Sequence, residues 1–253
     1  MRLRISALAV AFVLARAAGA QTVSEHLAAG DRELAALHAA AALQHYEAAV
    51  AAEPTNYDAL WKAARVAIDV GGAEATPESR RKAYQSGEQY ARRAVEANPR
   101  DPEGHFQLAR ALGRTALSLG KRQRVKYAKD VRTHALQALA LNPNHAGALD
   151  VMGMWNAEIM RLNGFERFAA KNLLGGQVFS EASWKEAVRY LEAAVAAQPE
   201  RIVHRINLAE VYEDVGDRAK ARATYESVLR AEVLDPRDPV YKQQAAERLR
   251  KLG

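Results

Sequence analysis

The sequence contains no cysteine, and aromatic residues make up only 7% of it. Without cysteine there can be no disulfide, no thiolate metal site and no cysteine nucleophile. The seven histidines are scattered, and no acidic third ligand joins His38 and His45 at metal spacing. The chain also lacks a His-Glu-x-x-His motif, a Gly-x-Ser-x-Gly motif and a glycine-rich phosphate loop. We therefore expect no enzyme activity, no metal and no cofactor.

Long apolar runs are scarce as well. Residues 1–20 combine a basic start, a short apolar middle and small residues at the end, which is typical of a cleavable signal peptide. The apolar middle is too short for a membrane span, and no later stretch approaches that length. We expect a mature chain from Gln21 that is exported, to the periplasm in a bacterium. The alternative in a eukaryote is a mitochondrial presequence, because the start is arginine-rich and free of acids.

Strong net charge is also missing. The formal net charge is +6, of which Arg2, Arg4 and Arg16 in the signal-like segment supply three, so the remainder is close to +3. Such a mild excess does not favour nucleic acid as a partner.

Prolines are few, but four of the eight close the same Ala-rich phrase. An Ala-rich helical end followed by proline, recurring along a chain, indicates a helical repeat array. The spacings are 45, 44 and 56 residues, which exceed a 34-residue period by 11, 10 and 22 residues. The four phrases are 48–54, 94–99, 138–143 and 193–199.

Counting back from each proline tests this idea against the tetratricopeptide repeat, in which two antiparallel helices cross closely at small residues. Alanine or glycine falls on nearly every crossing position, although Val131 is larger than the pattern wants. The fifth copy is the most regular, with Leu208, Ala209, Tyr212, Gly216, Asp217, Ala221 and Tyr225 in place.

The pattern predicts an all-α fold, a right-handed α-solenoid of about five tetratricopeptide-like helix pairs. After the signal peptide, one repeat domain is expected over residues 21–253. All three insertions fall between the two helices of a repeat, and the longest should carry a helix over Phe165–Leu174 that ends at a glycine pair. The expected repeats are 23–55, 56–100, 101–144, 145–200 and 201–235, and the expected capping helix is 237–252.

Three stretches make the likeness more specific: Glu53–Arg65, Gly87–Pro99 and Gly153–Leu174. They resemble the regulator of microtubule dynamics protein family, and the long insertion falls at the place where that family has one. The resemblance covers roughly residues 52–252. It implies a tetratricopeptide-like helical domain with binding or tethering roles and no enzyme activity, in a family whose eukaryotic members act at microtubules and membranes.

The first helix of each repeat should line a concave groove, through positions that share one helix face. In two successive repeats an aromatic residue precedes an arginine by four positions, so each pair lies on the same face one turn apart. A planar guanidinium suits carboxylates and phosphates, and the aromatic rings offer apolar area. The candidate groove residues are Trp61, Lys62, Arg65, Phe106, Gln107, Arg110 and Arg114. In the simpler interpretation these arginines are solvated or pair with nearby acids, namely Asp58, Asp69 and Glu103.

The long insertion offers a second candidate, a flap formed by Phe165, Phe168, Leu173 and Leu174 that covers the groove or touches a membrane. The alternative is that this helix buries its aromatic rings against its own repeat. A basic run over residues 121–132 could attract an anionic membrane surface, or it could simply be the wet face of a long helix.

Two functions remain open from the sequence. The first is a non-enzymatic exported scaffold that binds a protein or peptide in its groove. The alternative is a carrier of a lipid or other anionic amphiphile, with the groove closed by the insertion and any membrane contact peripheral.

Overall fold

The computed structural model describes residues 22–119, 121–164, 166, 168 and 177–252. These residues are helical apart from short connections, and no β-strand occurs among them. The predicted signal peptide lies outside the described residues. A helix over residues 22–35 is followed by α2 (Ala39–Ala52), α3 (Tyr57–Ala73), α4 (Pro77–Ala97), α5 (Pro102–Leu117), α6 (Lys121–Leu141), α7 (Ala146–Met160), the 3₁₀ turn η1 (Gln177–Glu181), α9 (Trp184–Ala197), α10 (Ile202–Asp214), α11 (Arg218–Arg230) and α12 (Asp238–Leu252).

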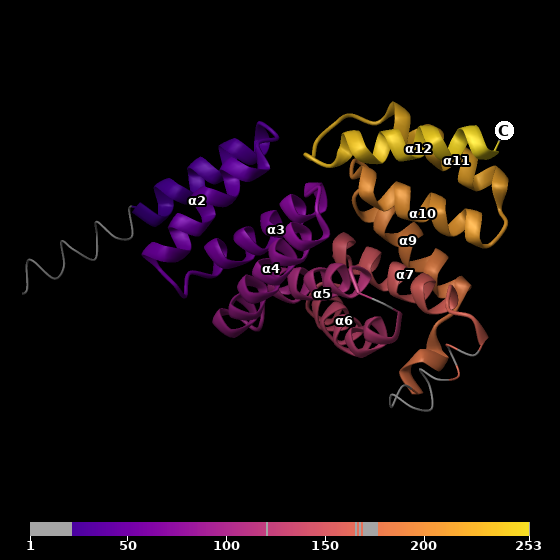
Figure 1. Ribbon diagram of the computed structural model, residues 1–253, viewed down its shortest axis with the longest axis horizontal. Coiled ribbons are helices and arrows are strands. Elements are labelled where there is room, and N and C mark those ends of the chain that lie inside the picture. The colour runs from indigo at the N-terminus through magenta and orange to yellow at the C-terminus, as the bar shows by residue number, and fades with distance from the viewer. Residues whose placement is uncertain (1–21, 120, 165, 167, 169–176, 253) are drawn as a thin grey trace, which may run out of the picture.

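Successive helices pack as antiparallel pairs that stack in chain order along a curved path (Figure 1). The pairs are α3 with α4, α5 with α6, α7 with α9, and α10 with α11. The first helices of neighbouring pairs also touch, since α5 contacts both α3 and α7, and α7 contacts α10. The first helices therefore line the inner face of the curve, and the predicted α-solenoid of helix pairs is confirmed.

Short polar connections set the helix starts. Asn56 accepts from the N–H of Ala59 at 3.0 Å, Thr76 from Ser79 at 3.1 Å, and Asp217 from Lys220 at 3.0 Å. Each side chain satisfies one of the N–H groups that a helix leaves unpaired at its start. Such caps let the chain reverse within a few residues and place the next helix antiparallel.

The seams between paired helices are made of small residues. A Cβ atom at Gly87 would lie 2.8 Å from Ile68 Cγ1, and one at Gly153 would lie 2.5 Å from Leu191 Cγ. Both distances are shorter than real carbon contacts, so the helices have no room for a side chain at these crossings. Val131, which the pattern marks as too large, is nevertheless buried, with 6% of its surface exposed.

The first two insertions lengthen existing helices. α3 has 17 residues and α4 and α6 have 21 each, more than a standard repeat helix. In the third insertion the expected helix over Phe165–Leu174 falls largely outside the described residues. Phe168 is described and is 64% exposed. At the end of this insertion Phe179 in η1 is buried and stacks on Trp155 of α7, with 6.2 Å between ring centroids.

The end of the chain folds back over the inner face. α12 packs against α10 and α11. The segment between α11 and α12, residues 231–237, runs toward α3, and we call it the strap (Figure 1). Its Arg237 lies against Gly72 in the last turn of α3, where an added Cβ would come very close to the guanidinium. The concave face is thus bridged by the protein's own chain.

None of the described helices is long and apolar enough to span a bilayer.

Candidate functional site

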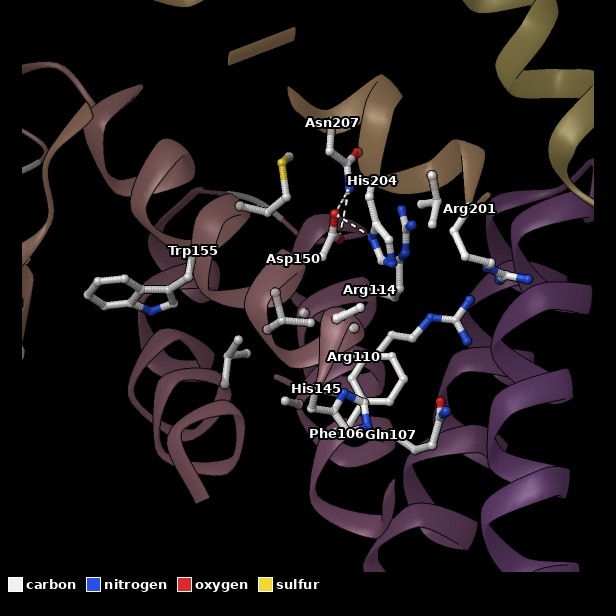
Figure 2. A pocket seen from close by; sticks show the side chains of 18 of the residues that line it. Phe106, Gln107, Arg110, Arg114, His145, Asp150, Trp155, Arg201, His204 and Asn207 are labelled. Atoms are coloured by element: carbon white, nitrogen blue, oxygen red, sulfur yellow. Dashed lines mark hydrogen bonds and ion pairs between the residues drawn. The ribbon is translucent and has the colours of Figure 1, made fainter. Parts of the chain in front are cut away.

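The concave face holds a cavity of about 720 Å³ between the first helices of the repeats and the strap (Figure 2). Its walls come from α3, α5, α6, α7 and α10, with the strap and the first turns of α12 on the remaining side. Six of the seven groove residues expected from the sequence line this cavity: Trp61, Arg65, Phe106, Gln107, Arg110 and Arg114.

Lys62 is the exception, because it lies outside the cavity. Its Nζ is 2.6 Å from the carboxylate of Asp31 on the preceding helix pair, in a separate small hollow. Each residue turns an α-helix by about 100°, so the neighbour of the cavity-lining Trp61 faces another side of α3. Burial by itself would raise the pKa of Asp31, but hydrogen bonds from Lys62 and Tyr46 hold that pKa below its usual value.

Arg110 is committed to an internal partner. Its guanidinium forms an ion pair with Asp69 of α3, whose side chain is only 3% exposed, and it also donates to the backbone oxygen of Arg65 at 3.4 Å. Burial opposes the charge on Arg110, yet its pKa is raised because Asp69 lies against it. This pair matches the simpler interpretation of the sequence, in which a groove arginine binds a nearby carboxylate.

Arg65 is paired with Asp235, a residue for which the sequence predicts no role. Asp235 of the strap, with 8% of its side chain exposed, lies 3.8 Å from Arg65 of α3 and 2.9 Å from Arg201, the residue that precedes α10. Burial would raise the pKa of Asp235, but Arg201, the N–H of Arg237 and the charge of Arg110 bring that pKa below its usual value. Asp235 is therefore an ionised carboxylate held among arginines.

The strap is fixed by its own turn. The carboxylate of Asp238 accepts from the N–H groups of Leu234 and Asp235 at 2.9 Å and 2.8 Å, and Asp235 accepts from the N–H of Arg237 at 3.1 Å. Two Asp-Pro pairs in this stretch are the local sequence signal for such a helix start. These pairs predict the turn, but they do not predict which distant helix the turn packs against.

Gln107 and Glu103 belong to a buried polar network on one wall. Gln107 Nε2 donates to Glu103 at 2.6 Å, and Glu103 lies 3.2 Å from His145 Nε2. His145 Nδ1 accepts from the N–H of Ala148, so the ring proton is on Nε2 and points at Glu103. Burial would raise the pKa of Glu103, but the hydrogen bonds from His145 and Gln107 lower it.

Phe106 covers the same wall with apolar area. Its ring lies 4.8 Å from the His145 ring, measured between centroids, and rests directly on Gly147 at the start of α7. Any side chain at position 147 would displace the Phe106 ring, because an added Cβ would overlap its edge.

Arg114 differs from the other groove arginines. Within the part of the chain that the structure describes, five of the seven arginines lining the cavity pair with a carboxylate, and Arg114 does not. Figure 2 shows its guanidinium pointing into the cavity, toward α10. The other exception, Arg237, packs against Gly72 and lies over the Tyr241 ring at 5.2 Å. Arg114 therefore carries a positive charge that the described residues do not neutralise by a direct contact.

The α10 side of the cavity supplies a second polar cluster. Asp150 of α7 lies 3.0 Å from His204 Nδ1 and accepts from Asn207 Nδ2 at 2.9 Å and 3.0 Å (Figure 2). This cluster links α7 to α10 on the side of the cavity toward which Arg114 points (Figure 2).

The remaining wall is apolar. Where α5, α6 and α7 meet, the cavity is bordered by Leu117, Val131, Met154, Trp155, Ile159 and Leu162. The site therefore joins an apolar side to a side rich in arginine. No cluster of three or more histidine, cysteine, aspartate or glutamate side chains that could hold a metal occurs among the described residues.

Antiparallel helix pairs that cross at small residues and stack into a curved array are the architecture of a tetratricopeptide repeat protein. The fold is similar to a thermophilic TPR protein of Thermus thermophilus, with a TM-score of 0.64 and 22% identity over 90% of this chain and 98% of that one. It is also similar to Pseudomonas aeruginosa pilF, with a TM-score of 0.50 and 13% identity over 93% of this chain and 88% of that one. At these identities the likeness shows the fold alone.

The family is shown by a match over residues 21–253 to the model described as "Regulator of microtubule dynamics protein 1-3", and the chain belongs to that family. Among curated relatives, "Regulator of microtubule dynamics protein 1" of Bos taurus is 28% identical over 149 residues, which is 58% of this chain and 46% of the relative. The Mus musculus protein is 26% identical over 149 residues, covering 58% and 48%. The chain thus matches about half the length of these relatives.

Proposed function

We propose that this protein is a non-enzymatic binding scaffold, and that its concave cavity receives an anionic group of a protein partner at Arg114. One observation carries the proposal: Arg114 lines the cavity and forms no ion pair with a described carboxylate. The nearby arginines do form such pairs, Arg110 with Asp69, and Arg65 and Arg201 with Asp235. A guanidinium in a partly dehydrated cavity binds a carboxylate or phosphate more strongly than one in open solvent. The fold supports the same role, because helical-repeat arrays use their concave faces for binding.

The relatives' name refers to microtubule dynamics. Because the chain matches less than half of the length of the bovine relative, we define the partner by its anionic group and not by that name.

The test is affinity capture from cells of the source organism, with the recovered proteins quantified by mass spectrometry. Arg114→Glu is compared with the unchanged protein and with Arg222→Glu, which reverses the charge of an exposed arginine on α11 outside the cavity. We expect Arg114→Glu to reduce recovery of at least one partner about ten-fold or more, because it places like charges in contact. Equal recovery with all three proteins would overturn the assignment of Arg114.

A second candidate is a carrier of an anionic amphiphile, and the apolar wall between α5, α6 and α7 favours it. The cavity volume falls within the range of about 300–1,000 Å³ that small-molecule pockets have. Under this function an acyl chain lies along Leu117, Val131 and Trp155 while its head group meets Arg114. Organic extraction of the purified protein followed by mass spectrometry separates the two functions. A stoichiometric amphiphile supports the carrier, and an amphiphile-free extract together with an Arg114-dependent protein supports the scaffold.

Export is a further part of the proposal, and it is supported by the signal-like pattern of residues 1–20. N-terminal sequencing of the protein isolated from its host should begin at Gln21. A mature protein that still starts at Met1 would contradict this.

A further inference from the structure

The strap places a carboxylate between two arginines of the cavity. Asp235 has only 8% of its side chain exposed, lies between Arg201 at 2.9 Å and Arg65 at 3.8 Å, and also feels the charge of Arg110. Arg65 and Arg201 come from opposite sides of the cavity. They form ion pairs with no other described carboxylate, so Asp235 is their shared counterion.

Arg237, two residues after Asp235 in the strap, makes a less favourable contact with α3. Arg237 rests on Gly72, where any added side chain would collide with its guanidinium. Its Nη1 is buried and has no hydrogen-bond partner among the described residues. A buried donor without an acceptor costs free energy in the closed arrangement. The strap is therefore attached to α3 by the ion pair of Asp235 with Arg65 and by the packing of Arg237 on Gly72, in which one nitrogen of Arg237 has no acceptor.

We propose that the strap is an intramolecular latch: Asp235 occupies a carboxylate-binding site formed by Arg65 and Arg201, and an acidic group of an incoming protein partner competes with Asp235 for this site. The existence of the partner rests on the proposed function, whereas the latch itself does not. The two groups can compete because a guanidinium binds the carboxylate of Asp235 and the carboxylate of a partner in the same geometry. Displacing Asp235 frees the strap from α3 and widens the entrance to the cavity and to Arg114.

The absence of cysteine makes this movement measurable. Spin labels on cysteines placed at Ala75 and Glu232, two exposed positions on either side of the contact between α3 and the strap, attach nowhere else in the chain. Their separation is measured by electron–electron double resonance. We expect a single short-distance population in the otherwise unchanged protein.

Two variants should open the latch from opposite sides. Asp235→Asn removes the charge that Arg65 and Arg201 bind, and Gly72→Leu displaces the Arg237 guanidinium without removing any charged group from the chain. Each should raise the long-distance population about ten-fold. The matched controls are Glu200→Gln, an exposed carboxylate with no ion pair among the described residues, and Ala73→Leu, the exposed neighbour of Gly72. Both controls should keep the short distance.

Competition is tested on the same labelled protein with a short oligoglutamate peptide, and with an oligoglutamine peptide of equal length at the same ionic strength. Only oligoglutamate should populate the long distance. A short distance that persists in both opening variants would overturn the latch, and equal effects of the two peptides would overturn competition by carboxylates. Because these distances are read on the protein alone, a failure of the Arg114 capture experiment leaves the latch standing, and the reverse also holds.

Discussion

The helix seams and the concave cavity of this protein are built from opposite kinds of residue. At the seams, Gly87 and Gly153 let helices approach until no side chain fits between them. In the cavity, arginines and carboxylates from different repeats meet one another, as Arg110 does with Asp69. The seams hold each pair of helices together by packing, whereas the cavity charges set how the pairs are joined across the curve. Substitutions in the two regions should therefore affect different measurements.

The largest effect is expected at a seam. Gly153→Leu adds a side chain 2.5 Å from Leu191 and close to the backbone oxygen of Ala187, neither of which can move freely. We expect the free energy of unfolding, measured by urea titration, to fall by about 3 kcal/mol. The comparison is Gly113→Ala on α5, where an added Cβ meets nothing within 4 Å. That change should raise the free energy of unfolding by about 0.5–1 kcal/mol through helix propensity alone. Similar losses in both variants would show that tight crossings do not explain the seams.

An effect of similar size distinguishes two arginines that lie one turn apart on the cavity wall. Arg110→Met leaves the buried carboxylate of Asp69 without its partner and should lower the free energy of unfolding by about 3 kcal/mol. Arg114→Met leaves no described carboxylate without a partner, so it should change the free energy of unfolding by no more than about 0.5 kcal/mol. Urea titrations of the two variants, side by side, measure the contrast. Equal losses would mean that Arg114 has a structural role, and would weaken its assignment as the ligand contact.

A smaller effect is expected from pH at the seam between α5 and α6. His105 Nε2 lies 3.2 Å from the oxygen of Pro99 and donates to it, so His105 Nδ1 accepts the proton of His134 Nδ1 at 3.1 Å. Burial lowers the pKa of His134, His105 and Arg92 lower it further, and Asp130 opposes them.

Because the folded pKa of His134 is below its unfolded value, the unfolded chain binds the proton first. Stability from this group is complete above about pH 6.5 and is lost as the pH falls below that value, by at most about 1.4 kcal/mol per pH unit. Urea midpoints between about pH 7.5 and pH 5.5 measure the slope. His134→Gln should flatten it. An unchanged slope in His134→Gln would place the titrating group elsewhere.

The seams could be predicted from the sequence because they depend on local pattern. Alanine and glycine at helix crossings and a proline after each pair recur along the chain, and each crossing involves residues of one repeat. The same is true of the cavity wall on α5, where Phe106, Gln107, Arg110 and Arg114 share a face by helix period. Lys62 shows the limit of this reasoning. It follows the cavity-lining Trp61 by one residue on α3, and its side chain points to Asp31 and not into the cavity.

The strap could not be predicted in this way. Residues 231–237 have no repeat pattern, and their meeting with α3 depends on the curvature summed over all the intervening helix pairs. Asp235 and Arg65 are 170 residues apart, and nothing near either one in the sequence marks the other as a partner. The pairing of Asp235 with both Arg65 and Arg201 therefore becomes visible only in the folded structure.

The contact of the strap with α3 also changes how this array should unfold. In an open array each repeat touches only its neighbours, so an end can fray without any consequence for distant repeats. Here a residue that precedes the last helix is bonded to the second repeat, and loosening the C-terminal end removes a contact near the other end. From the second repeat to the last helix the array is closed by this contact, so α3 and the strap should lose hydrogen-exchange protection together.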